Sequence, residues 1–241
     1  MKKTINALLN KLFGLRIVND IYYNNLLIDL KKQKVIGIFN FFSKDNKIIE
    51  ILLKHIVKSK SKEQQDFFVL STLGLKKNGV FVEFGGLDGL KGSNTYLLEK
   101  EFEWEGLIIE PSKQYKEKLK LNRGCQIDFR CISDKNDQKI IFNEIPNSGL
   151  STIDKYSNLD KHSSRRKKGN KYEVKTITLE KVLDEYNFPK LIDYVSIDTE
   201  GSEYDVIKVF PFDRYKIKTI TIEHNNNNIL RKKINILLKK K

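Results

Sequence analysis

The sequence predicts an α/β fold built on a parallel sheet of the Rossmann type. A short apolar run, Val80–Phe84, ends at a pair of glycines, and a second, residues 107–109, ends directly before Glu110. A segment with helical spacing lies between them, so the order is strand, glycine-rich turn, helix, strand, as in a nucleotide-binding βαβ unit. Three further apolar runs alternate with helical patterns towards the C-terminal end, and such alternation predicts parallel strands.

Residues 1–60 are expected to form a mainly helical N-terminal extension. Apolar residues recur at helical spacing in residues 8–15, 21–32 and 48–57. The first of these helices could lie on an anionic membrane surface or pack on its own domain. A polar Ser-Lys repeat then marks the boundary to a second domain, residues 61–241.

The second domain should contain alternating helices and strands, because helical spacing and short apolar runs follow one another along it. The predicted helices are residues 62–75, 94–102, 113–121, 178–186, 204–210 and 229–238. The predicted strands are residues 80–84, 107–109, 125–132, 139–142, 172–177, 194–197 and 217–222. Residues 146–171 lack periodicity, which is typical of a functional lid or a disordered linker.

Composition and charge set limits on the class of protein. The chain has 241 residues, 39% of them hydrophobic and 32% charged, which is enough for one α/β domain with an extension. The net charge of +14 is typical of proteins that bind polyanions or membrane surfaces, but evenly spread lysines produce the same value without such a partner. No apolar run is long enough to span a bilayer, and Asn10 and Lys11 interrupt the first apolar stretch, which argues against a secretory signal.

We therefore expect a cytoplasmic protein, with peripheral contact to a membrane as the alternative. The two cysteines, Cys125 and Cys131, have no metal-ligand spacing and are expected to be free thiols of a reducing compartment.

The glycine spacing in the first turn favours a cationic ligand over a dinucleotide. A dinucleotide site requires G-x-G-x-x-G, which seats a pyrophosphate on a helix N-terminus. Here the turn carries Gly85 and Gly86, and the acids Glu83 and Asp88 would repel an anion. S-adenosylmethionine has an ammonium group and a ribose, and acids such as Glu83 and Glu110 at two strand ends suit both groups. An ordinary turn without a ligand is the alternative.

Several ordered motifs resemble the FkbM-type S-adenosylmethionine-dependent methyltransferases. They are the first turn, Ser93-Asn94-Thr95-Tyr96, Glu110-Pro111, Ile132-Ser133-Asp134 and residues 149–152, 197–203 and 222–225. The resemblance covers roughly residue 61 to the end, and it implies a class I methyltransferase sheet that binds S-adenosyl-L-methionine. The cofactor-binding residues that it implies are Glu83, Gly85, Gly86, Asp88, Asn94, Glu110, Pro111, Ser133 and Asp198.

One feature departs from this family. Its sheet normally ends in a closing antiparallel pair of strands, for which the sequence has no candidates before Lys241. The alternatives are a truncated chain, or an edge covered by the N-terminal extension or by a second subunit, and the last of these would make a homodimer.

Catalytic residues are expected at the ends of the fourth and fifth strands of the parallel sheet. Methyl transfer is an in-line displacement in which the enzyme aligns two substrates and removes one proton. Asp198 and Glu200 follow the fourth strand, where charge pairing with a helix dipole is the alternative role. His224 follows the fifth strand and is a candidate general base, because imidazole exchanges protons near neutral pH. Asp198 with Glu223 or Asn225 could also gather Mg²⁺, although most methyltransferases need no metal and none is assigned here.

The expected acceptor is a hydroxyl of a sugar, a glycan or a related small metabolite, as the resemblance suggests. Motifs for methylation of exocyclic amines or cytosine are absent, and no Lys-Asp-Lys-Glu tetrad of an RNA ribose methyltransferase can be assembled, so nucleic acid is not expected. The alternative function is a catalytically inactive basic module that binds a polyanion such as RNA or anionic lipid.

The irregular segment carries a basic run that could recognise an anionic acceptor. Arg165 and Arg166 could clamp a phosphate in bidentate fashion if the segment is a lid over the site. The alternative is a solvated surface loop, since like-charge runs are usually disordered.

Overall fold

The computed structural model describes residues 45–240. The chain divides into two units, residues 1–58 and 59–241. In the first, α3 (Asn46–Lys54) begins at Asp45, whose side chain accepts a hydrogen bond from the backbone nitrogen of Lys47 at 2.9 Å. This helix confirms the prediction for residues 48–57. The helices expected in residues 8–15 and 21–32 lie outside the described residues.

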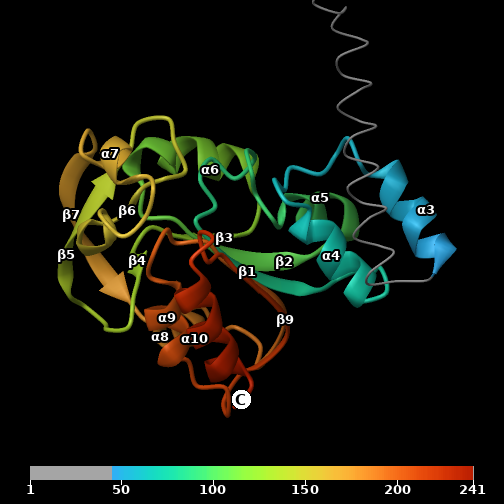
Figure 1. The fold of residues 1–241 in the computed structure, drawn as a ribbon. Coiled ribbons are helices and arrows are strands. Elements are labelled where there is room, and N and C mark those ends of the chain that lie inside the picture. Colours follow the sequence, from blue (N-terminus) through green and yellow to red (C-terminus); the bar gives the residue numbers. More distant parts are fainter. Residues whose placement is uncertain (1–44, 241) are drawn as a thin grey trace, which may run out of the picture. The chain divides into compact units, whose positions relative to one another are not determined.

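The second unit is built on a five-stranded parallel sheet with the strand order β3-β2-β1-β8-β9 (Figure 1). The strands are β1 (Val80–Phe84), β2 (Glu105–Ile109), β3 (Gln126–Asp128), β8 (Leu191–Ile197) and β9 (Lys216–Ile222). The prediction of a Rossmann-like parallel sheet is therefore confirmed. Within residues 45–240, β9 pairs with β8 alone, and no antiparallel strands extend this sheet.

Helices cover both faces of this sheet, as in other doubly wound folds. Figure 1 shows α4, α5 and α6 along one face and α8, α9 and α10 along the other. Their bounds are α4 (Gln65–Thr72), α5 (Tyr96–Phe102), α6 (Lys116–Asn122), α8 (Leu179–Glu185), α9 (Glu203–Lys208) and α10 (Asn228–Leu238). A short 3₁₀ turn, η1 (Lys113–Tyr115), precedes α6. Leu107, Val195 and Val206 are fully buried in the core between sheet and helices.

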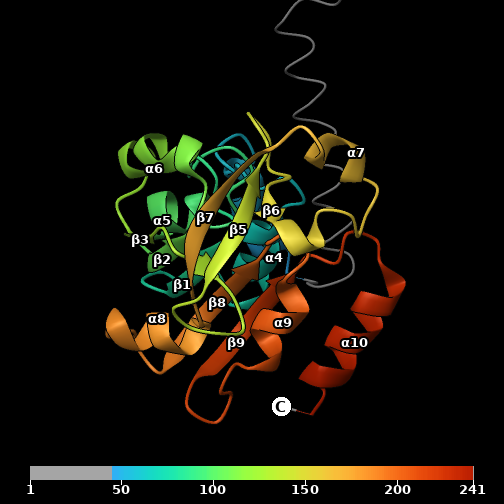
Figure 2. The ribbon, with the colours of Figure 1, turned by 90° about the vertical axis from the view of Figure 1, so that its left-hand side faces the viewer.

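A smaller four-stranded sheet lies beside the parallel one and faces the viewer in Figure 2. Its strands, in the order β4-β7-β5-β6, are β4 (Cys131–Ile132), β7 (Asn170–Ile177), β5 (Lys139–Glu144) and β6 (Thr152–Ile153). The predicted strands near residues 139–142 and 172–177 are confirmed, and they pair with each other in antiparallel fashion. Their union in a second sheet was not predicted.

The third predicted strand, residues 125–132, is wrong as a single element. Asp128 ends β3 because its side chain accepts a hydrogen bond from the backbone nitrogen of Arg130 at 2.7 Å. The guanidinium of Arg130 also donates to both oxygens of Asp128 and, at 2.5 Å, to Glu185. This turn redirects the chain, so that β4 leaves the parallel sheet and pairs with β7.

The segment of residues 146–171 is more regular than predicted. It contains β6, the 3₁₀ turn η2 (Asp154–Tyr156) and α7 (Ser163–Arg166). Ile153 and Tyr156 are buried in a small apolar cluster with Cys131 and Phe142. The segment therefore packs on the protein instead of forming a solvated loop.

None of the helices in residues 45–240 has the length and apolarity needed to cross a bilayer.

Candidate functional site

The register of the parallel sheet places four strand ends in a row. Phe84 of β1 pairs with Ile109 of β2 and Ile197 of β8, and Ile197 pairs with Ile222 of β9. The next residue of each strand therefore lies at the carboxyl edge, where α/β folds bind ligands. These residues are Gly85, Glu110, Asp198 and Glu223.

Gly85 and Gly86 are required by packing against the neighbouring strands. Gly85 has a φ of +77°, and a Cβ added there would lie 2.1 Å from the carbonyl oxygen of Asp198. A Cβ on Gly86 would lie 2.4 Å from Cγ2 of Ile108. The turn after β1 thus passes directly over the ends of β8 and β2, which brings it to the acids that follow these strands.

Glu110 is buried and holds two turns of the site. Its Oε2 accepts a hydrogen bond from the backbone nitrogen of Leu87, and its Oε1 accepts one from that of Ser112, both at 2.9 Å. Burial raises the pKa of this carboxyl to about 7, and the nearby charges of Glu144 and Glu83 act in the same direction. The carboxyl is therefore poised to gain or lose a proton near neutral pH.

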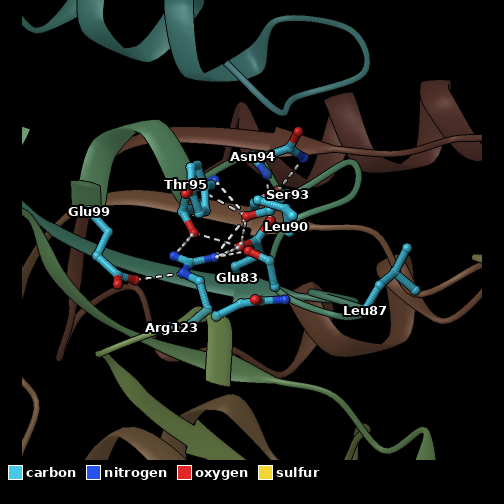
Figure 3. A network of polar contacts seen from close by, with 12 residues as sticks. Glu83, Leu87, Leu90, Ser93, Asn94, Thr95, Glu99 and Arg123 are labelled. Carbon is cyan, nitrogen blue, oxygen red and sulfur yellow. Dashed lines mark hydrogen bonds and ion pairs between the residues drawn. The ribbon is translucent and has the colours of Figure 1, made fainter. Parts of the chain in front are cut away.

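Glu83, which is predicted to contact the donor, is buried and enclosed by its own loop (Figure 3). Its Oε1 accepts a hydrogen bond from the backbone nitrogen of Asn94 at 2.6 Å. Its Oε2 accepts bonds from the hydroxyls of Ser93 at 2.9 Å and Thr95 at 2.5 Å, and pairs with Arg123 at 3.4 Å. Both oxygens are thus engaged in holding residues 93–95.

Asn94 likewise belongs to the framework of the site. Its Nδ2 donates to the hydroxyl of Ser196 at 3.0 Å, and its Oδ1 accepts from the hydroxyl of Ser61 at 2.8 Å. Asp88 is different, because it is half-buried and its Oδ1 alone caps the turn, accepting from the backbone nitrogens of Leu90 at 3.0 Å and Lys91 at 2.7 Å. In the described part of the chain, no donor meets Oδ2 of Asp88, so this acid can accept a ligand.

Pro111 and Ser133 lie at the side of the site. The carbonyl of Pro111 accepts a hydrogen bond from the hydroxyl of Tyr172 at 3.4 Å, and Pro111 borders a hollow of 340 Å³ that Phe129 also lines. Ser133 follows β4 of the smaller sheet and is outside the row of four strand ends. Its hydroxyl donates to Asp134 at 3.1 Å.

Three acids meet at the ends of β8 and β9. One carboxylate oxygen from each of Asp198, Glu200 and Glu223 lies within 4.8 Å of the other two. Burial, and next the adjacent Glu223, raise the pKa of Asp198 well above its usual range. Burial and the charge of Glu223 also raise the pKa of Glu200, to about 7. Oε2 of Glu223 is buried and meets no donor within residues 45–240.

Glu200 is held by a buried arginine from α7. Arg166 donates from Nη2 to Oε2 of Glu200 at 2.8 Å, from Nη1 to Asp160 at 2.8 Å and from Nε to the carbonyl of Leu150 at 2.9 Å. Asn225 donates to the same oxygen of Glu200 at 3.2 Å. Because the side chain of Arg166 has 0% exposure, the prediction that it clamps an acceptor phosphate is wrong. The sequence does not distinguish it from the neighbouring Arg165, which is exposed.

His224 and Glu203 complete the surroundings. His224 is half-buried, and its Nδ1 is buried without a hydrogen-bond partner in the described residues. Glu203 is fully buried, and its Oε1 accepts bonds from the backbone nitrogens of Thr199 at 3.1 Å and Gly201 at 2.9 Å, which closes the turn before α9. The structure therefore brings Asp198 and Glu200 together with Glu223, which the sequence proposed only as a metal ligand.

Comparison with known proteins agrees with this geometry. The family model of the methyltransferase FkbM domain matches residues 83–236, more than half of the chain. No significant match was found among curated proteins or solved structures. The matched region begins at Glu83, two residues before Gly85, and includes all of the strand ends described above. The chain belongs to the FkbM methyltransferase family.

Proposed function

We propose that this methyltransferase transfers the methyl group of S-adenosyl-L-methionine to a hydroxyl of a sugar, a glycan or a related small metabolite. The observation that carries the proposal is the close approach of the Gly85 turn to the end of β8, where three acids meet. Such an arrangement would allow a cationic donor to bind beside groups that can take a proton. Because this donor is a cytoplasmic metabolite, the proposal also places the reaction in the cytoplasm.

In this proposal, the donor lies along the carboxyl edge from Glu110 to Asp198. Glu110 would accept hydrogen bonds from the ribose hydroxyls, since each of its oxygens has a lone pair beyond the one that a backbone nitrogen uses. Asp88 would meet the ammonium group, because it is the acid of the turn whose Oδ2 is free of donors in the described residues, whereas Glu83 is enclosed. Gly85 would let the donor approach the backbone.

The acid trio would act as the proton acceptor. Binding of a sulfonium cation beside Asp198 lowers the pKa of that carboxyl, because an opposite charge favours the ionised form. The donor would supply the methyl group, with the electron pair of its carbon–sulfur bond left on sulfur, and Asp198 or Glu200 would take the proton that the acceptor hydroxyl loses. Arg166 would keep Glu200 oriented during this transfer. The unpartnered Nδ1 of His224 is the alternative base.

A divalent cation is the alternative to shared protons. The oxygens of Asp198, Glu200 and Glu223 lie close enough to hold Mg²⁺, which prefers carboxylate ligands. Arg166 already places a positive charge on Glu200, however, and this disfavours a second cation there. We therefore expect EDTA to leave turnover unchanged. A loss of turnover that Mg²⁺ restores would assign the metal to these acids.

The proposal is tested by donor binding and then by turnover. Calorimetry with S-adenosylhomocysteine should detect binding to the intact chain, and methyl-deuterated donor should label hydroxyl-bearing glycans in a mass-spectrometric screen. The Asp198→Asn variant should bind S-adenosylhomocysteine but lose labelling. Salt-sensitive retention on heparin without any donor binding would instead support the inactive polyanion-binding module.

A further inference from the structure

A buried arginine stands beneath the turn that carries Gly85 and Asp88. Arg123 follows α6, and its side chain has 0% exposure. Figure 3 shows its guanidinium surrounded by the turn between β1 and α5. Its Nη1 donates to the hydroxyl of Ser93 at 2.8 Å and to the carbonyl of Gly89 at 3.3 Å, and its Nη2 donates to the hydroxyl of Thr95 at 2.8 Å.

Two carboxylates flank the same guanidinium. Nε of Arg123 donates to Glu99 at 2.6 Å, and Nη1 lies 3.4 Å from Oε2 of Glu83. The rings of Phe81 and Tyr96 lie 5.5 Å and 6.0 Å from its central carbon. A buried charge is costly unless it is paired and hydrogen-bonded, and this one is both.

These contacts determine the path of the turn. A Cβ on Gly89 would lie 2.5 Å from Cγ of Arg123, so the turn packs on the aliphatic part of the arginine. The adjacent Asn122 donates to the carbonyl of Asp88 at 2.7 Å. The end of α6 therefore holds the carbonyls of Asp88 and Gly89, while Glu83 holds residues 93–95 from the other side.

We propose that Arg123 is a positioning residue for the methyl donor: together with Glu83, it holds residues 85–95 in the conformation that receives the donor. The inference rests on the proposed function. It assigns Glu83 an indirect role, because its carboxylate is directed at Arg123 and at its own loop. An arginine is needed because only its planar guanidinium group can donate to Gly89, Ser93 and Thr95 at the same time.

The test measures binding of S-adenosylhomocysteine by calorimetry, at temperatures where circular dichroism shows each variant to be folded. Arg123→Met should weaken binding by about tenfold or more, and Arg123→Lys should fall between this variant and the wild type. Arg214→Met is the control, because Arg214 is also ion-paired, but with Glu180 and Asp184 of α8, which covers the other face of the sheet. It should change the affinity by less than about twofold.

A double variant separates positioning from general stability. Glu83→Gln combined with Arg123→Met removes the unpaired buried charge that the single arginine variant leaves, so the Tm should recover in part. The affinity for S-adenosylhomocysteine should remain low, because the guanidinium group that holds the turn is still missing. Two results would overturn the inference about Arg123 without affecting the proposed function. One is a double variant that recovers affinity together with the Tm, and the other is wild-type affinity in the folded Arg123→Met variant. A wild-type protein that binds no S-adenosylhomocysteine would overturn the proposed function as well.

Discussion

Donor affinity should depend on the protonation state of Glu110. Burial raises the pKa of this carboxyl to about 7, and both of its oxygens already accept a backbone N–H. The ionised form can also accept two ribose hydroxyls, whereas the protonated form carries an O–H that must itself find an acceptor. Raising the pH through 7 increases the ionised fraction, so we expect affinity to rise with pH.

The size of the effect follows from that pKa. A carboxyl that titrates at about 7 is roughly one-tenth ionised at pH 6 and nine-tenths ionised at pH 8. The affinity for S-adenosylhomocysteine should therefore be about tenfold weaker at pH 6 than at pH 8. Glu110→Gln should remove this slope and cost about 1–3 kcal/mol of binding free energy at pH 8, since one backbone N–H then faces the amide N–H₂ group.

Calorimetry at pH 6, 7 and 8 and constant ionic strength measures the slope directly. Repeating the pH 6 titration in two buffers of different ionisation enthalpy counts the protons released, and nearly one should leave per donor bound. Glu117→Gln is the control, since Glu117 lies exposed on α6 and this variant should keep the wild-type slope. A flat wild-type profile, or an unchanged slope in Glu110→Gln, would refute this account of Glu110.

Two further predictions concern backbone space and buried charge. Gly85→Ala should destabilise the protein by about 1–3 kcal/mol and abolish donor binding, since its Cβ would meet the carbonyl of Asp198 at a φ of +77°; urea unfolding and calorimetry measure both effects. Arg166→Ala should lower the free energy of unfolding by about 3–5 kcal/mol, because Glu200 loses its buried partner. Arg165→Ala should change it by less than about 0.5 kcal/mol, and equal effects of the two arginine variants in urea would contradict the burial of Arg166.

The parallel sheet could be predicted because its central strands are buried. Such strands read as mostly apolar runs, and Val80–Phe84 and Leu191–Ile197 both have this character, although Glu83 interrupts the first and Asp193 and Ser196 interrupt the second. The glycines of the first turn were also informative, since Gly85 needs a positive φ. The same reasoning failed for residues 125–132, because the turn in which Asp128 accepts a hydrogen bond from the backbone of Arg130 lies within a stretch whose apolar and polar residues alternate as in a strand.

The smaller sheet was harder to predict because its strands are partly exposed and their partners are distant. In β7, buried and exposed positions alternate only in part, and the irregular segment separates β7 from its partner β5 in the sequence.

The roles of the site residues were also hard to predict from the sequence. A single sequence identifies acids that follow strands, such as Glu83 and Glu110, but it does not reveal which of them a buried arginine neutralises.

The distribution of paired and unpaired acids supports the proposed cationic donor, although the chain has a net charge of +14. Arg123 pairs with Glu83 and Arg166 pairs with Glu200. Among the described residues, no lysine or arginine forms an ion pair with Glu110, Asp198 or Glu223, which follow β2, β8 and β9 at the same edge of the sheet. The two arginines hold the surrounding turns, and the acids that they leave unpaired line the carboxyl edge. In the proposed function, a sulfonium donor would meet these acids, and its positive charge would favour their ionised forms.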